Sequence, residues 1–217
     1  MSSQRPVFVL ATTNAHKARE IREIFAGESF DAELAERPPG APEVEETEPT
    51  LLGNALLKAA ALVALTGLPA IAEDSGIEVD ALGGAPGVRS ARYAGEPSDD
   101  QRNVDKVLAE LAHLPALPDQ RRARFVTVAV AQWPDGRAIS ASGTVEGWVV
   151  LERRGTGGFG YDPVFVPFEG DGRTFAEMAE KSPELKHAIS HRGRALRSLA
   201  AQLKDATWQA AVDENGS

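Results

Sequence analysis

Two adjacent carboxylates stand out among the residues that can do chemistry. Glu73 and Asp74 follow the apolar segment 70–72, which predicts a short strand, and a Ser-Gly pair comes directly after them. Catalytic groups of α/β proteins gather where strands end. Mg²⁺ prefers a few carboxylates together with substrate phosphates, and the acidic segment 43–48 offers further oxygen ligands. A plain turn explains the same four residues equally well.

A second candidate site lies near the N-terminus. A predicted strand over residues 6–12 is followed by Asn14, which is a typical cap for a helix. The intervening Thr, Asn and Lys side chains and the first N–H groups of such a helix can hold a phosphate. The glycines of a P-loop are absent, so the segment does not match that motif.

Basic residues gather between Lys181 and Arg197. Ser190 is expected to cap a last helix, and Lys186 and Arg192 beside that helix start form a plausible anion site. A solvated helix face accounts for about half of these charges equally well. His187 and His191 are four residues apart, but a zinc site needs three or four ligands and the chain has no cysteine, so zinc is disfavoured.

The segment 155–160 matches the dinucleotide-binding pattern G-x-G-x-x-G. That pattern has meaning only between a strand and a helix. Pro163 and Pro167 follow closely and prevent a helix, so a Rossmann fold is disfavoured. A glycine-rich loop still lets backbone approach a ligand, with Phe159 and Tyr161 as stacking surfaces, although a simple turn is about as plausible.

The elements that position these residues alternate between strands and helices, which predicts an α/β protein with a mixed sheet. We expect residues 77–82 to continue the strand 70–72 as a hairpin, and residues 38–49 to form a loop. The helix after Thr50 is expected to bury Leu52, Leu56, Ala59, Leu62 and Val63. Strands are predicted over 6–12, 70–72, 124–133 and 138–151, and helices after Asn14, over 50–65, over 99–112 and from Ser190.

Composition excludes several classes of protein. The chain has 217 residues, of which 42 % are hydrophobic and 25 % charged, as in ordinary globular proteins and unlike disordered ones. No apolar run is long enough to span a membrane or to form a signal peptide. Without cysteine there is no disulfide, so we expect a cytoplasmic protein. The formal net charge of −9 argues against nucleic-acid binding.

Five segments stand in order over about residues 6–204: VLATTNAHKAREI, EETEPTLLGNALLKA, LPAIAEDSGIEVDALGGAPGVRSARYAG, GTGGFGYDPVFVP and KHAISHRGRAL. Together they resemble the inosine triphosphate pyrophosphatase family, whose members hydrolyse ITP, dITP and XTP. The resemblance implies a fold of two lobes with a central cleft, built on an elongated mixed sheet flanked by helices. It also implies a homodimer with no nucleic-acid or membrane partner.

The resemblance also implies roles for particular residues. Asp74 is expected to be the catalytic base and a Mg²⁺ ligand. Glu45 is the second expected ligand, with Glu46 as a one-residue alternative. The implied substrate contacts are Thr12, Thr13, Asn14, Ala15, His16, Lys17, Ser75, Phe159, Gly160, Tyr161, Asp162, Lys186, His191 and Arg192. We expect one domain over residues 1–205 and a flexible tail over 206–217.

The chain departs from the family pattern at three places. Thr13 stands where a glycine is common, and Glu48-Pro49 replaces the glycine that usually ends the acidic segment. Gly53 replaces a glutamate, which removes a possible capping box with Thr50. The second departure leaves the choice between Glu45 and Glu46 open.

The function expected from the resemblance is Mg²⁺-dependent hydrolysis of deaminated purine triphosphates to the monophosphate and pyrophosphate, which cleanses the nucleotide pool. One alternative is a pyrophosphatase for modified pyrimidine triphosphates. Another is a nucleotide-binding regulator without turnover. Asp74, Glu45 and Lys17 argue against the regulator, because they are the groups that turnover needs.

Overall fold

The computed structural model describes residues 5–215, of which 206–215 are described as backbone only. Within that range one sheet has the strand order β2-β1-β3-β4-β5-β6. β1 runs parallel to β2 and β3, whereas β5 and β6 are antiparallel, so the predicted mixed sheet is confirmed. The strands are β1 (Val7–Leu10), β2 (Glu33–Ala35), β3 (Ala70–Val79), β4 (Arg122–Gln132), β5 (Ala138–Val149) and β6 (Phe165–Pro167).

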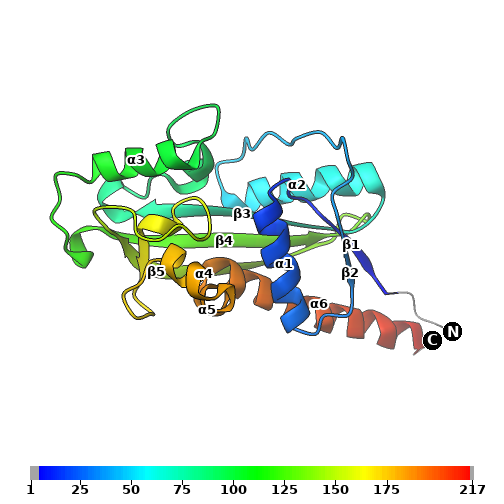
Figure 1. Cartoon of the computed structure of the whole chain (residues 1–217). Helices are drawn as coiled ribbons and strands as arrows, with labels where there is room; N and C mark the ends of the chain where they lie inside the picture. The colour runs from blue at the N-terminus through cyan, green and yellow to red at the C-terminus, as the bar shows by residue number, and fades with distance from the viewer. Residues whose placement is uncertain (1–4, 216–217) are drawn as a thin grey trace. The chain divides into compact units, whose positions relative to one another are not determined.

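Helices flank this sheet, as expected (Figure 1). The α-helices are α1 (Ala15–Gly27), α2 (Leu51–Thr66), α3 (Asp100–Glu110), α4 (Phe175–Lys181), α5 (Pro183–Ile189) and α6 (His191–Asn215). Short 3₁₀ helices are η1 (Asp80–Leu82), η2 (Gly87–Arg92), η3 (Pro118–Gln120) and η4 (Asp162–Val164). None of the helices in the described range is long and apolar enough to span a bilayer.

The described chain divides into two compact units. Unit 1 holds residues 5–74, 128–142 and 195–215, and unit 2 holds residues 75–127 and 143–194. The division crosses β3 between Asp74 and Ser75, so these two neighbouring residues belong to different units. The central cleft stays a prediction.

The core of unit 1 has two faces because side chains alternate along its strands. Phe8 and Leu10 of β1 pack with α1 and α6. Val9 and Ala11, one residue out of phase, pack with α2 on the other face. Figure 1 shows α2 on one side of β1 and β3 and α1 on the other. This alternation decides which helix each polar residue of β3 meets.

The core of unit 2 is a single cluster around the ends of β3, β4 and β5. Val104 and Val107 of α3 contribute one wall, and Phe175 and Met178 of α4 another. Phe125 of β4 lies within it, with its ring edge-on to Phe165 at a centroid distance of 4.8 Å. This cluster supports the segments that carry the unit's polar site residues.

Three predicted helix starts are confirmed by their caps. Asn14 Oδ1 accepts the N–H groups of His16 and Lys17 at the start of α1. Thr50 Oγ1 accepts the N–H of Gly53 in α2, and Ser190 Oγ accepts that of Gly193 in α6. Such caps satisfy N–H groups that have no partner within the helix. They fix where each helix begins, and hence where the adjacent site residues lie.

The predicted hairpin at residues 77–82 is wrong. β3 continues without a break to Val79, and the turn of η1 follows it. Ile77 and Val79 are fully buried in the core of unit 2, which favours continuation of the strand. Glu73 and Asp74 therefore lie in the middle of β3 and not at a strand end. Lysines from two helices balance the charges of these two carboxylates within the strand.

The buried stripe of α2 is partly wrong. Ala59 and Leu62 are buried as expected, but Leu52 is 40 % exposed. The buried face runs instead through Leu51 and Ala55, one residue earlier on the helix. Asn54 lies on this face as well, fully buried. A polar side chain in that position needs a hydrogen-bonding partner from the sheet.

Four short elements were not predicted: β2, β6, α4 and α5. Each has three or seven residues, too few to establish a hydrophobic period. The loop at residues 38–49 is confirmed. The backbone of α6 continues to Asn215, and the single domain and flexible tail stay predictions.

Candidate active site

In unit 1, the predicted phosphate-binding segment forms the turn between β1 and α1. Thr12 Oγ1 accepts the N–H of Asn14 at 3.1 Å, which tightens the turn before the helix. His16 Nδ1 lies 3.5 Å from Arg19 Nη2 on the exposed side of α1. Thr13 is exposed and has no positive φ. The turn therefore does not need the glycine that is common in the family.

A cavity of about 360 Å³ opens beside this turn. Thr12, Thr13, Asn14 and Ala15 form part of its lining. Arg22 and Arg37 line it too and make it a basic environment, although Arg22 pairs with Glu36 at 3.3 Å. The cavity gives the predicted phosphate segment an accessible surface beside two arginines.

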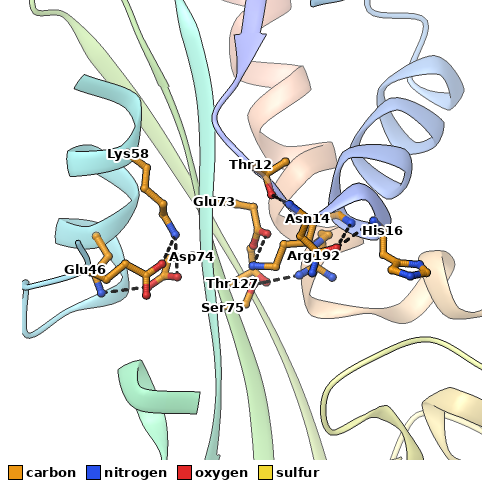
Figure 2. A network of polar contacts seen from close by, with 12 residues as sticks. Thr12, Asn14, His16, Glu46, Lys58, Glu73, Asp74, Ser75, Thr127 and Arg192 are labelled. Atoms are coloured by element: carbon orange, nitrogen blue, oxygen red, sulfur yellow. Dashed lines mark hydrogen bonds and ion pairs between the residues drawn. The ribbon is translucent and has the colours of Figure 1, made fainter. Parts of the chain in front are cut away.

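The two carboxylates of β3 point to opposite faces of the strand (Figure 2). Glu73 Oε1 lies 2.9 Å from Nζ of Lys17 on α1. Asp74 Oδ1 lies 2.9 Å from Nζ of Lys58 on α2. Adjacent residues of a strand face opposite ways, so each acidic residue meets a different helix and a different lysine.

Asp74 is the centre of a buried network. Asn54 Nδ2 donates to Asp74 Oδ2 at 3.2 Å, while Lys58 Nζ contacts the other oxygen. Lys58 Nζ also lies 2.9 Å from Oε1 of Glu46. Asn54 Oδ1 accepts the N–H of Glu48 at 3.0 Å, which fixes the acidic segment against α2. The network thus brings a loop carboxylate to the strand carboxylate.

Burial and charge act against each other in this network. Burial, which is the largest effect, raises the pKa of Asp74, and the neighbouring charge of Glu46 raises it further. The ammonium of Lys58 lowers the pKa, but the pKa of Asp74 stays above its ordinary value. Burial lowers the pKa of Lys58, but Asp74, Glu46 and Glu73 outweigh burial and raise it. Lys58 is therefore charged at neutral pH. Asp74 is a stronger base than an exposed aspartate.

The residues present fit a Mg²⁺ ion that shares its coordination with phosphate. Asp74 and Glu46 already converge on one cation, the ammonium of Lys58. Among the described residues no third acidic, His or Cys side chain joins them, so substrate or water would have to supply the further ligands. Glu45, the first choice from the sequence, is exposed, whereas the alternative Glu46 belongs to the network.

In unit 2, Ser75 begins a second polar group. Ser75 Oγ lies 2.7 Å from Oγ1 of Thr127 on β4. Arg192 Nη2 donates to Ser75 Oγ at 3.4 Å. Only 2 % of the surface of Arg192 is exposed. Figure 2 shows the three side chains together. A buried guanidinium held in this way is suited to bind an anionic or carbonyl oxygen.

Four predicted substrate-binding residues come together in unit 2. Lys186 Nζ donates to Asp162 Oδ2 at 2.8 Å, and both side chains are buried. The same oxygen accepts the N–H of Phe159 at 2.9 Å. Lys186 Nζ and Arg192 Cζ lie 5.0 and 5.2 Å from the ring centroid of Phe159. The aromatic face is therefore flanked by two cations.

The glycines of segment 155–160 serve close packing of this loop. A Cβ on Gly155 would lie 2.6 Å from the backbone nitrogen of Glu177 in α4. A Cβ on Gly158 would lie 2.1 Å from Asp162 Oδ2, and its φ of +74° favours glycine. Gly160 N–H donates to Oδ2 of Asp100 at 2.9 Å. These contacts hold Phe159 in place.

His191 and Tyr161 are buried in unit 2. The ring of His191 stacks on Phe125 with centroids 4.4 Å apart and planes 6° from parallel. Tyr161 donates its hydroxyl hydrogen to the carbonyl oxygen of Ser90 at 2.9 Å. Both rings belong to the support of the loop and of the start of α6.

Tyrosine ionisation is expected to begin well above the ordinary range. Tyr93 and Tyr161 are the only tyrosines of the chain. Burial and a hydrogen bond to Glu110 raise the pKa of Tyr93 to about 12, and burial raises the pKa of Tyr161. The contribution of these two tyrosines to the free energy of unfolding is complete below the pKa of about 10 that tyrosine has in the unfolded chain. It is lost as the pH rises through the raised pKa values of the folded protein.

A near-ultraviolet absorbance titration measures this directly. At a pH of about 10, where free tyrosine is half ionised, the native protein should show almost no phenolate absorbance. The protein unfolded in guanidinium should titrate near that pH and serves as the control. Ionisation of clearly more than one of the two native tyrosines at the same pH contradicts the buried placement of Tyr161.

The sequence did not identify Asn54 and Lys58 as site residues. They are four residues apart on a predicted helix, so they share a face. A polar residue inside an otherwise apolar helical stripe was the available signal. The strand that this face meets could not be read from that spacing. Thr127 and Asp100 carried no signal in the sequence.

Glu48 and Gly53, two of the departures from the family pattern, depend on each other in the structure. A Cβ on Gly53 would lie 2.6 Å from Cβ of Glu48, so the glutamate at position 48 requires a glycine at position 53. The Thr50 cap nevertheless persists through the Gly53 N–H. The loss of an acidic group at position 53 is thus accompanied by a carboxylate from position 48 over the same helical turn.

The fold and these polar groups define an α/β protein with a lysine-balanced carboxylate pair on a central strand. The model of the Ham1 family matches residues 8–202. A dITP/XTP pyrophosphatase of Symbiobacterium thermophilum is 53 % identical over 94 % of this chain and 96 % of its own length. One of Bacillus cereus is 47 % identical over 94 % and 98 %.

A solved HAM1 protein from Coxiella burnetii superposes with a TM-score of 0.80 and 37 % identity, covering 92 % of this chain and 99 % of its own. The chain therefore belongs to the Ham1 family. The family resemblance predicted from the five segments is confirmed.

Proposed function

We propose that this protein hydrolyses deaminated purine nucleoside triphosphates (ITP, dITP and XTP) to the monophosphate and pyrophosphate with Mg²⁺. It is a nucleoside triphosphate pyrophosphatase by its relatives, and its work is the cleansing of the nucleotide pool. The observation that carries the mechanism is Asp74, buried in mid-strand and held by Asn54 and Lys58.

Asp74 is the proposed general base. It orients a water molecule and takes its proton as the water oxygen attacks the α-phosphorus. The bond between the α-phosphorus and the bridging oxygen breaks, and pyrophosphate leaves. Asn54 keeps one carboxylate oxygen fixed by donating to it, so the other oxygen has a defined direction. The buried position keeps this oxygen poorly hydrated.

The turn from Thr12 to Lys17 is the proposed phosphate-binding segment. Thr12, Thr13, Asn14 and Ala15 line the cavity beside the start of α1, and Lys17 pairs with Glu73 on the neighbouring strand β3. Asp74 and Glu46 are the proposed metal ligands, with Glu45 as the alternative. When bound, Mg²⁺ supplies positive charge that offsets charge developing on the phosphate oxygens.

The polar group of unit 2 is the proposed base-recognition site. Phe159 offers a face for stacking, and Lys186 and Arg192 offer donors beside it. Hypoxanthine and xanthine carry an acceptor oxygen at C6, which matches these donors. Ser75, Gly160, Tyr161, Asp162 and His191 complete the set of proposed substrate-binding residues.

Product analysis tests the proposed reaction. With dITP and Mg²⁺, phosphorus NMR should show pyrophosphate and dIMP in equal amounts as the first products. Asp74→Asn protein, purified in the same way, is the control for contaminating phosphatases. Release of orthophosphate and dIDP contradicts attack at the α-phosphorus.

The same assay separates the alternatives. Faster turnover of a modified pyrimidine triphosphate than of dITP identifies the pyrimidine enzyme. Nucleotide binding without any product identifies a regulator. The homodimer and the cytoplasmic location stay predictions, and light scattering tests the former against the monomer mass of 23.1 kDa.

A further inference from the structure

The ammonium of Lys58 lies between the two proposed metal ligands (Figure 2). Its Nζ is 2.9 Å from Glu46 Oε1 and 2.9 Å from Asp74 Oδ1. The Lys58 side chain is 13 % exposed and that of Asp74 is 7 % exposed. The proposed role of the carboxylates uses these oxygens, but it gives no part to the lysine that binds them.

Helix α2 fixes this arrangement from two positions on one face. Asn54 and Lys58 are one turn apart, and they hold the two different oxygens of Asp74. Asn54 also accepts the N–H of Glu48, which anchors the loop that carries Glu46. The carboxylates are therefore kept together before any ligand arrives.

Two converging carboxylates in a largely buried place repel one another unless a cation lies between them. The ammonium of Lys58 supplies that charge in direct contact with both carboxylates. A divalent cation placed between the same two carboxylates meets the ammonium at close range, so repulsion between the two cations opposes simultaneous occupancy. A lysine carries a compact charge on a flexible stem, and it can leave without moving the helix.

We propose that Lys58 is a positioning residue that takes the place of the metal in the nucleotide-free protein. This inference rests on the proposed function. Its consequence is an order of binding: the metal enters together with the triphosphate, whose oxygens complete the coordination, and the protein holds no divalent cation beforehand.

Mn²⁺ binding, followed by electron paramagnetic resonance of the free ion, tests the inference without turnover. Without nucleotide, Lys58→Met should bind Mn²⁺ about tenfold or more tightly than wild type, because a unit positive charge at hydrogen-bonding distance opposes cation binding at least that strongly. Asp74→Asn serves as the baseline for binding elsewhere on the acidic surface.

Lys17→Met is the matched control. It removes an equal charge from an equal ion pair, at 2.9 Å from Glu73 on the opposite face of β3. Its nucleotide-free Mn²⁺ affinity should rise clearly less than that of Lys58→Met, because Lys17 acts on Asp74 only as a more distant charge, whereas Lys58 contacts both Asp74 and Glu46. Equal tightening in both variants means a general charge effect, and it overturns the inference.

Two further measurements do not depend on the folding of Lys58→Met. Lys58→Arg retains the charge and should retain weak nucleotide-free binding; tighter binding overturns the inference. In wild type, a non-hydrolysable dITP analogue should raise Mn²⁺ affinity strongly, and equal affinity with and without it overturns the inference.

A merely structural ion pair predicts lower thermal stability of Lys58→Met with no gain in Mn²⁺ affinity.

These outcomes are distinct from failure of the proposed function. Pyrophosphate release from dITP by wild type, together with unchanged Mn²⁺ affinity in Lys58→Met, retains the function and rejects the role of Lys58. Absence of pyrophosphate release rejects the function whatever the Mn²⁺ data show.

Discussion

Asp74→Asn is expected to lower kcat for dITP by about 10²–10⁴-fold, the range for loss of a general base. Asparagine has nearly the same shape, so packing in the middle of β3 persists. The carboxylate charge that accepts the proton of water is lost. The fold should remain, because Asn54 and Lys58 donate to different oxygens of Asp74 and one of the two keeps its acceptor in the asparagine carbonyl oxygen.

The neighbouring carboxylate provides the control for this variant. Glu73→Gln changes charge by the same amount one residue away, but its side chain faces Lys17 and α1. It should retain far more turnover than Asp74→Asn. Steady-state kinetics at saturating Mg²⁺, with circular dichroism to confirm folding, measures both. Retention of more than about a tenth of kcat in Asp74→Asn, against the range above, would assign the base to another group.

ATP is expected to be a poorer substrate than ITP by about 10²-fold or more in kcat/KM. Adenine presents a donor amine at C6 where hypoxanthine presents an acceptor oxygen. The donors available in unit 2, Lys186 and Arg192, are both buried. A buried donor that meets another donor loses its partner, and such mismatches discriminate by orders of magnitude.

Two lysine variants separate recognition of the base by a buried donor from a general effect of charge. Lys186→Met should reduce the ratio of kcat/KM for ITP to that for ATP. Lys181→Met is matched in size and charge, but Lys181 is exposed, so the ratio should not change. Comparable kcat/KM for ATP and ITP in wild type contradicts base recognition by these donors.

The sequence predicted the elements whose boundaries depend on local chemistry. Asn14, Thr50 and Ser190 mark helix starts because their side chains bind nearby N–H groups, and this signal needs no knowledge of the rest of the chain. The start of α4 carries an equally local signal, the capping box of Thr174 and Glu177, but the seven residues of α4 and the seven of α5 are too few to establish a hydrophobic period.

The middle of β3 shows why part of the site could not be predicted. Two acidic residues in sequence favour a turn, and only the lysines of α1 and α2 make them compatible with a strand. Those partners are 56 and 16 residues away, so the stabilising contact exists only in the folded chain. Glu46 was separated from Glu45 by the same contact with Lys58.

The opposite facing of Glu73 and Asp74 has a consequence for how the gene can change. One codon inserted or deleted within the first three residues of β3 would exchange the faces of the two carboxylates, placing Glu73 on the side of Lys58 and Asp74 on the side of Lys17. Charge balance would survive, yet the acid beside Glu46 would have a longer stem and a different reach. One codon added in the exposed turn before β3, around Gly67, can loop out and leave the strand phase intact. Insertions and deletions of single residues should therefore be tolerated before Ala70, where β3 begins, and not within the strand.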